Sequence, residues 1–435
     1  MKDMLKKVAV GLSTTALLTQ MMVLPSFAGI TVVVSGNGVD TDNTVNVTST
    51  NTTTVNQTNE ANINNDVDAT ANSGGNEVDG STGGDVSIDT GKAEATVGVS
   101  NAVNSNEAHV ACGGCPTNVS VEISENGKKS DNDVTLGLQN TTWVKQDNTA
   151  NIKNDVDVDA NSGENDIKDS TGGDYSIDTG MAKAYATVSN QANANVATVA
   201  GGGEGALALV ISGNGVESDN TITLGLKNDV TLFQNNLANI SNDIEVDAVS
   251  GKNDIEDSTG GLVSIDTGDA EAGATVDTMA NFNYADVLDC CDFGGLVKVA
   301  GNGKESDNDV NLAMLSSLYV TQDNDFLCGR GGYEHPMFEL FGKKFSFGGY
   351  DKGNDCNDVD VLANSGDNNV DDSTGEYDGD PSIDTGNAKT VVDVENAGNS
   401  NVFTTGDALS DLPEMDFGSM NWFIWLLAGG SNTQG

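Results

Sequence analysis

The chain has 435 residues and a formal net charge of −47, from 66 acidic and 19 basic side chains. This charge repels phosphate backbones and anionic membrane surfaces, so we exclude charge-driven binding to nucleic acid or to acidic lipid. Aromatic residues make up 5% of the chain and there are five prolines, so a core must come mainly from small aliphatic side chains and strands are rarely interrupted.

Residues 1–28 have the pattern of a secretory signal peptide. Three lysines precede an apolar stretch from Val8 to about Leu24, and Ser26-Phe27-Ala28 offers a small-residue cleavage site. A retained membrane anchor is the alternative, but Ser, Thr and Gln interrupt the apolar stretch. We therefore expect a bacterial protein that is secreted, starts at residue 29 when mature, and has no transmembrane span.

The rest of the chain repeats with a period of about 88 residues. The stretch 161–180 has near-copies at 72–91, 250–268 and 364–386. The Ser-Thr-Gly motifs at 81, 170, 258 and 373 are spaced 89, 88 and 115 residues apart, and the excess in the last spacing is 115 − 88, or 27 residues. This pattern predicts a repeat protein whose fourth unit carries an insertion. We divide it into repeats at 29–116, 117–203, 204–294 and 295–407, with an apolar tail at 408–435.

Within each repeat, apolar residues alternate with polar ones. In the second repeat Val134, Leu136 and Leu138 alternate with Thr and Gly. Such runs, about four to seven residues long and separated by Gly, Asn, Asp and Ser, predict short strands with one buried face. The two halves of a repeat also resemble each other, which predicts a structural coil shorter than 88 residues.

Two all-β architectures fit this spacing. One is a β-solenoid, similar to a parallel β-helix, made from four repeats of about 88 residues. The other is a string of tandem β-sandwich modules. The expected buried positions are mainly Val, Ala and Ile, which suit a narrow solenoid interior better than the thicker core between two sandwich sheets. The sequence therefore favours the solenoid.

A family resemblance is carried by Gln57-x-Asn59-x-Ala61-x-Ile63 and its copies. The same run occurs at 146–152 and 234–240, whereas the fourth copy keeps only its Gln and Asn. It resembles the repeats of curlin-type bacterial fibre subunits, and the long repeat is similar to those of secreted bacterial surface proteins. The resemblance implies a β-solenoid-like extracellular fibre of biofilm with a structural or adhesive role.

Acidic residues recur in one register of the repeat, together with the Asp of each Ser-Ile-Asp-Thr-Gly segment. Stacked carboxylates repel each other, and calcium suits carboxylate and carbonyl oxygens on flexible turns. The candidate calcium ligands are Asp66, Asp68, Asp155, Asp157, Asp159, Asp243, Asp247, Asp358 and Asp360. The alternative is that these residues cap turns and keep a long β structure soluble. No EF-hand or calcium nonapeptide motif occurs.

The insertion in the fourth repeat is bracketed by Cys328 and Cys356, and we expect a disulfide between them. It is rich in aromatic and basic residues, which are common at interfaces. The candidate partner-binding residues are Arg330, Tyr333, Phe338, Phe341, Phe345, Phe347 and Tyr350. The alternative is that the aromatics form a small private core, such as a hairpin lying on the solenoid. The pairing of Cys112, Cys115, Cys290 and Cys291 stays open.

The C-terminal tail contains an unbroken apolar run, 422–428, with Trp422 and Trp425. Seven residues are too few to cross a bilayer as a helix. The run fits a strand or cap over the last coil, a contact with another subunit or a secretion component, or a membrane contact.

Catalysis has little support in the sequence. There are two histidines, and no nucleophile-elbow, zinc-protease or phosphate-loop motif occurs. We expect a secreted structural or adhesive repeat protein, not an enzyme, that associates with itself or with another surface protein or glycan. The alternative is a β-helix that binds or cleaves carbohydrate, with the cysteine-closed loop as its specificity element.

Overall fold

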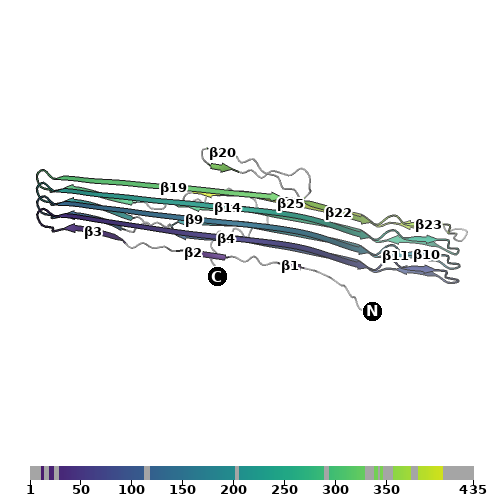
Figure 1. The fold of residues 1–435 in the computed structure, drawn as a ribbon. Coiled ribbons are helices and arrows are strands. Elements are labelled where there is room, and N and C mark those ends of the chain that lie inside the picture. The colour runs from purple at the N-terminus through teal and green to yellow at the C-terminus, as the bar shows by residue number, and fades with distance from the viewer. Residues whose placement is uncertain are drawn as a thin grey trace, which may run out of the picture.

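The computed structural model describes residues 11–13, 19–23, 29–111, 118–200, 205–288, 293–328, 338–340, 343–345, 356–373 and 381–404. The elements from β1 to β25 are all strands, and nearly all of them pair in parallel. Figure 1 shows long strands stacked in layers that cross the whole molecule. The fold is therefore all-β and of the β-solenoid type.

Each repeat forms one complete coil. Gln57 pairs with Gln146, Gln146 with Gln234, and Gln234 with Gln322, at offsets of 89, 88 and 88 residues. Equivalent residues of successive repeats therefore lie on top of one another in four stacked coils. Tandem sandwich modules are excluded, because the strands of one repeat pair with those of the next. The expectation of a coil shorter than 88 residues was wrong.

The strands are far longer than the sequence pattern predicted. The outward strand of a full coil has 31 residues, which spans about 100 Å. The outward strands are β4 (Asp42–Asn72), β9 (Asp131–Asn161), β14 (Asp219–Val249) and, in the interrupted fourth coil, β19 (Asp307–Leu327) and β22 (Asn357–Asn364). The Asn, Ser and Thr residues within them resemble turn formers, but their side chains stack on equivalent positions of the neighbouring coils or face solvent.

The chain returns through two strands that lie roughly end to end. The first is β7 (Ala93–Ala111), β12 (Ala182–Ala200), β17 (Ala270–Val287) or β25 (Ala388–Thr404). The second is β3 (Ile30–Ser35), β8 (Asn118–Ser124), β13 (Gly205–Ser212) or β18 (Phe293–Ala300). The sheet of returning strands faces the sheet of outward strands, so each coil is a flattened loop.

Short strands form the turn at the far end of each coil. They are β5 (Glu77–Asp79), β10 (Asp166–Lys168), β15 (Asp254–Glu256) and β23 (Asn369–Asp371), followed by β6 (Val86–Asp89), β11 (Tyr175–Thr179), β16 (Val263–Thr267) and β24 (Ser382–Asp384). Four further strands lie outside the repeat: β1 (Gly11–Ser13), β2 (Thr19–Val23), β20 (Phe338–Leu340) and β21 (Lys343–Phe345).

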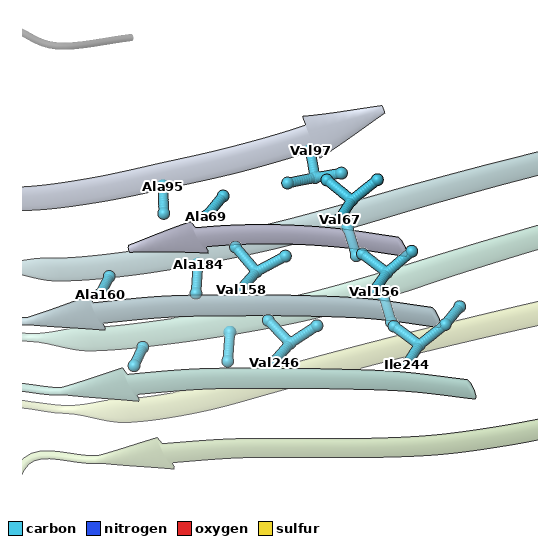
Figure 2. Packing of buried hydrophobic residues seen from close by; sticks show 14 of the residues in the cluster. Val67, Ala69, Ala95, Val97, Val156, Val158, Ala160, Ala184, Ile244 and Val246 are labelled. Atoms are coloured by element: carbon cyan, nitrogen blue, oxygen red, sulfur yellow. The ribbon is translucent and has the colours of Figure 1, made fainter. Parts of the chain in front are cut away.

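Small aliphatic side chains fill the space between the two sheets. Figure 2 shows Val156 and Val158 of one sheet facing Ala184 of the other, with Val67 and Ile244 in the neighbouring coils. Val and Ala at these positions keep the sheets close together, as their abundance in the sequence suggested. The five hydrophobic clusters of the described core are built from residues 30 onward.

Buried asparagines link both the coils and the sheets. Asn154 Nδ2 donates to Asn242 Oδ1 of the next coil at 2.6 Å and to Asn190 Oδ1 of the opposite sheet at 3.0 Å. Asn154 Oδ1 in turn accepts from Asn65 and Asn101. Because a buried amide needs partners for both its donor and its acceptor, these contacts fix the vertical register of the coils as well as the pairing of the sheets.

We predict that Asn154→Ala lowers the free energy of unfolding by about 2 kcal/mol or more, because neighbouring buried amides lose their partners. Asn151→Ala is the matched control on the same strand, since Asn151 donates to Asn62 on the solvent side. Its effect should stay within about 0.5 kcal/mol. Denaturant unfolding followed by circular dichroism measures both. Equal losses in the two variants would contradict a special role for the buried amides.

Candidate functional site

The predicted calcium ligands lie in columns on the outer face of the outward strands. One column contains Asp66, Asp155, Asp243 and Asp358, and the next contains Asp68, Asp157, Glu245 and Asp360. A third contains Asp159 and Asp247. The expectation that these residues occupy turns was wrong, because the alternation that buries Val156 and Val158 points the intervening carboxylates outward from a strand.

Burial and neighbouring like charges together raise the pKa of several of these carboxyl groups. Burial, then the charges of Asp68 and Asp155, raise the pKa of Asp157 above its usual value. Burial and neighbouring carboxylates, Asp157 and Asp159 respectively, likewise raise the pKa of Asp159 and Asp247. In-register stacking thus places like charges about 4.8 Å apart, where each disfavours ionisation of the next.

These columns do not form a recognisable metal centre. Within the described ranges, no group of three or more His, Cys, Asp or Glu side chains is arranged to hold a metal ion. The carboxylates repeat along a flat strand face instead of converging on one point. Calcium binding by these residues stays a prediction.

The insertion in the fourth coil is closed as expected. Cys328 and Cys356 have Cα atoms 4.4 Å apart, within disulfide distance. Inside the insertion, β20 and β21 pair in antiparallel, with Phe338 opposite Phe345, so this segment contains the hairpin considered as one alternative. Its side chains, including those of Arg330 and the aromatics, lie outside the described residues, as do Trp422, Trp425, Cys112, Cys115, Cys290 and Cys291.

An exposed aromatic row was missed by the sequence reasoning. Trp143 and Phe233 have ring centroids 6.3 Å apart, and Phe233 and Tyr319 have centroids 5.6 Å apart. The row crosses the outer face of β9, β14 and β19, with Trp143 and Tyr319 each 44% exposed. The repeat pattern does not reveal this row, because Trp143 and Tyr319 are equivalent positions of their repeats whereas Phe233 lies two residues further along its strand.

Among the described residues, the fourth coil leaves the end of the solenoid open along the middle of β19, while β21 of the insertion also contacts this strand. We define the fourth-coil edge as the outer side of β18, β19, β22 and β25, and the first-coil edge as the outer side of β3, β4 and β7. Leu312 and Met314 of β19 are 43% and 49% exposed, whereas their equivalents Leu224 and Leu226 in the third coil are buried. The inward-facing side chains of the last coil therefore lack a covering coil along the middle of β19.

Two columns of glycine show how closely the coils approach at their turns. A Cβ on Gly163 would lie 2.0 Å from the carbonyl oxygen of Gly251 above it, so only glycine fits there. Gly366 continues this column in the fourth coil, yet a Cβ on it would meet nothing closer than 3.9 Å. At the other end, a Cβ on Gly127 would lie 2.4 Å from Gly38 O, while one on Gly38 would meet only a methyl group at 3.8 Å.

Neither end glycine is needed for its backbone conformation, because Gly38 and Gly366 both lie outside the left-handed region of φ. A side chain at either position would be excluded only if another coil were stacked against that turn. The same residue type is therefore required inside the solenoid and has no steric task at its two ends.

The buried asparagine ladders have a direction. Asn65 donates to Asn154, Asn154 to Asn242, and Asn242 to Asn357, always from the lower coil to the upper one. A second path alternates between the sheets and ends where Asn324 donates to Asn401. Asn195, which is equivalent to Asn401, donates to Asn236 of the following coil. The corresponding hydrogen bond from Asn401 would therefore need an acceptor beyond the fourth coil.

A compact ionic group braces the outer face of the return sheet. Glu271 accepts from Lys183 at 2.6 Å and from Lys389 at 2.8 Å, one in the coil below and one in the coil above. These two contacts and a hydrogen bond from Tyr185 lower the pKa of Glu271 to about 2. Burial and the contact with Glu271 raise the pKa of Tyr185 to about 12.

Comparisons with protein-family models, with curated proteins and with solved structures each found no match. Over the part of the chain that the structure describes, no helix is both long enough and apolar enough to cross a membrane.

We predict that the protein is more stable at pH 5 than at pH 7. A carboxyl group with a raised pKa takes up protons more readily in the folded state, so its stabilising effect grows as the pH falls toward its ordinary pKa of 3.8. The lowered pKa of Glu271 acts oppositely, but its contribution is lost only as the pH falls below the ordinary value of 4.5. Thermal unfolding across this range measures the trend.

The double variant Asp157→Asn with Asp159→Asn should flatten this pH dependence. Its control, Asp40→Asn with Glu60→Gln, removes the same charge away from these columns and should leave most of the slope. A slope of the opposite sign in the native chain, or equal slopes in both variants, would contradict the proposed role of the columns.

Proposed function

We propose that this protein is a secreted structural element of a bacterial surface whose copies stack through their end coils into fibres. The observation that carries the proposal is the fourth-coil edge, where the middle of β19, a strand of 21 residues, is exposed among the described residues. Long, flat, uncovered edges are sites of strand addition, and folded proteins usually block them. The signal-like residues 1–28 and the cysteine pair at disulfide distance support export.

The two edges are complementary. In the buried asparagine ladders, the residue of the earlier coil donates its amide hydrogen and the residue of the later coil accepts it. The buried glutamine ladder runs the other way, because Gln146 donates to Gln57 and Gln234 donates to Gln146. At the fourth-coil edge the asparagine ladders therefore end in donors such as Asn357, and at the first-coil edge they begin with acceptors such as Asn65, while the glutamine ladder has the opposite ends; in both cases unlike ends meet when unlike edges join. A second copy placed on the fourth-coil edge, with its first coil in register, would continue both the strand pairing and the ladders.

A two-fold symmetric pairing of two identical edges does not have this property. It would set the strands of the two copies antiparallel and bring donor amides opposite donor amides. Joining unlike edges is a heterologous contact, and repetition of such a contact without closure gives an open filament. The geometry thus favours a polar fibre over a dimer, with strands perpendicular to the fibre axis.

A second candidate function is glycan binding, and the aromatic row favours it. Trp143, Phe233 and Tyr319 lie on a flat outer face beside Asp229, which accepts hydrogen bonds from Lys227 and Ser317. A sugar ring has an apolar face and polar edges, so it can stack on an aromatic ring while its hydroxyls contact such groups. This surface is compatible with the fibre, because it leaves the edges free.

We predict that purified protein without residues 1–28 forms slender fibres visible by electron microscopy. Fibre diffraction should show a spacing of about 4.8 Å along the axis and, because each copy contributes four coils, a repeat of about 19 Å. Compact particles that stay monomeric at high concentration in sedimentation would contradict the proposed function.

End-glycine variants separate assembly from folding. Gly366→Ala and Gly38→Ala should fold with nearly native stability, because the added Cβ has room in one copy. Each should prevent the join, because the interior equivalents show that a Cβ there would overlap a carbonyl oxygen of the stacked coil. Gly163→Ala is the control and should destabilise the single copy itself. Normal fibres from both end variants would overturn the in-register stacking.

Glycan binding is tested by sedimentation with insoluble cellulose and chitin. We expect Trp143→Ala with Tyr319→Ala to lose any retention on these polymers, because the stacking surface is removed. Leu262→Ala is the control, since Leu262 is an exposed apolar residue away from the row. Retention that survives the double change would assign binding to another surface.

A further inference from the structure

The first-coil edge is already partly occupied by the chain itself. β1 pairs with β7 over Gly98 to Ser100, and β2 pairs with β7 over Asn106 to Val110, both in parallel. In the strand order of this sheet, β1 and β2 lie on the side of β7 opposite to β12. Residues 11–13 and 19–23 therefore cover the side of β7 that faces away from the solenoid.

These two short strands keep the register of a coil. The offset from Gly11 to Gly98 is 98 − 11, or 87 residues, and that from Thr19 to Asn106 is 106 − 19, again 87. The constant offset means that both strands lie on β7 in one register. It is within two residues of the offset of 89 between β7 and β12.

The same positions are those that a second copy would need. Through the columns of the sheet, Gly98 corresponds to Asp393 of β25, and Asn106 corresponds to Asn401. If a fourth coil docked in register below β7, its residues 393–395 and 401–404 would pair where β1 and β2 pair now. One side of a strand can hydrogen-bond to one neighbour only, so the two occupants exclude each other.

We propose that β1 and β2 act as internal occupants of the β7 edge and hold back docking of the fourth coil of a second copy until they leave. This inference rests on the proposed function, because it identifies the β7 edge as part of the join. The occupant is short: β1 and β2 contain three and five residues, whereas β25 contains 17. A longer strand that continues the sheet can therefore replace it once the segment is removed or loosened.

As long as residues 1–28 remain attached, the chain can join another copy through its fourth-coil edge but not through its first-coil edge. The fourth-coil edge is open over the middle of β19, but the first-coil edge is obstructed along β7. Removal of the segment by a signal peptidase would then couple release of the chain to its ability to join other copies. Retention of the segment would favour short or unjoined species.

The test uses the full chain and a variant that cannot keep the segment paired. Met21→Pro with Met22→Pro removes two adjacent backbone N–H groups within β2, so that one of them is lost from the paired side. Thr15→Pro with Ala16→Pro is the control, since these residues lie between β1 and β2 in the sequence. The chain lacking residues 1–28 is the fully released reference, because the described core begins at residue 30.

Two measurements are made on each chain. Hydrogen exchange of residues 97–111 in dilute monomer reports whether the edge is covered, and elongation of preformed fibre seeds reports whether it can join. We expect slow exchange and several-fold slower elongation in the full chain and in the control. The double variant Met21→Pro with Met22→Pro should show the fast exchange and the fast elongation of the released reference.

The outcomes are distinguishable. Equal exchange in all four chains would overturn the inference, and so would equal elongation, although fibre growth itself would still support the proposed function. If the released reference fails to elongate seeds or to form fibres at any concentration, the proposed function falls, and with it the assignment of the β7 edge as a docking surface for a second copy.

Discussion

In-register stacking is the constraint on which the rest of the structure depends. Each residue lies on its equivalent one repeat later, so a single sequence choice is multiplied along a column. For Asn154 the result is a satisfied chain of amides, and for Asp157 it is a column of like charges that, together with burial, raises the pKa of this carboxyl group. For Gly163 it is a contact too close for any side chain.

The interior of each coil alternates between apolar and amide segments, and this gives the long strands a unique alignment. Val and Ala side chains are similar in shape and would tolerate a shift of two residues along a strand. The amides would not, because Asn148 contacts Asn195 of the opposite sheet and Asn236 of the next coil. Apolar burial therefore supplies cohesion, while the buried amides supply register.

The sequence was sufficient for the solenoid and the cysteine-closed insertion but not for the dimensions of a coil. The period of 88 residues and the scarcity of large side chains predicted the stack. Strand length was underestimated because Asn, Ser and Thr read locally as turn residues, and their buried partners, such as Asn190 for Asn154, lie far away in sequence. The aromatic row and the open edge were missed because both depend on which residues neighbouring coils bring together.

The width of the coil also determines how a fibre of such copies would carry load. Tension along the axis is shared in parallel by all the hydrogen bonds between two layers, and a strand of 31 residues contributes many of them at once. Within one copy, the covalent chain also passes from each layer to the next. Between copies it does not, so under tension the fibre should part at the junctions and leave the four-coil units intact.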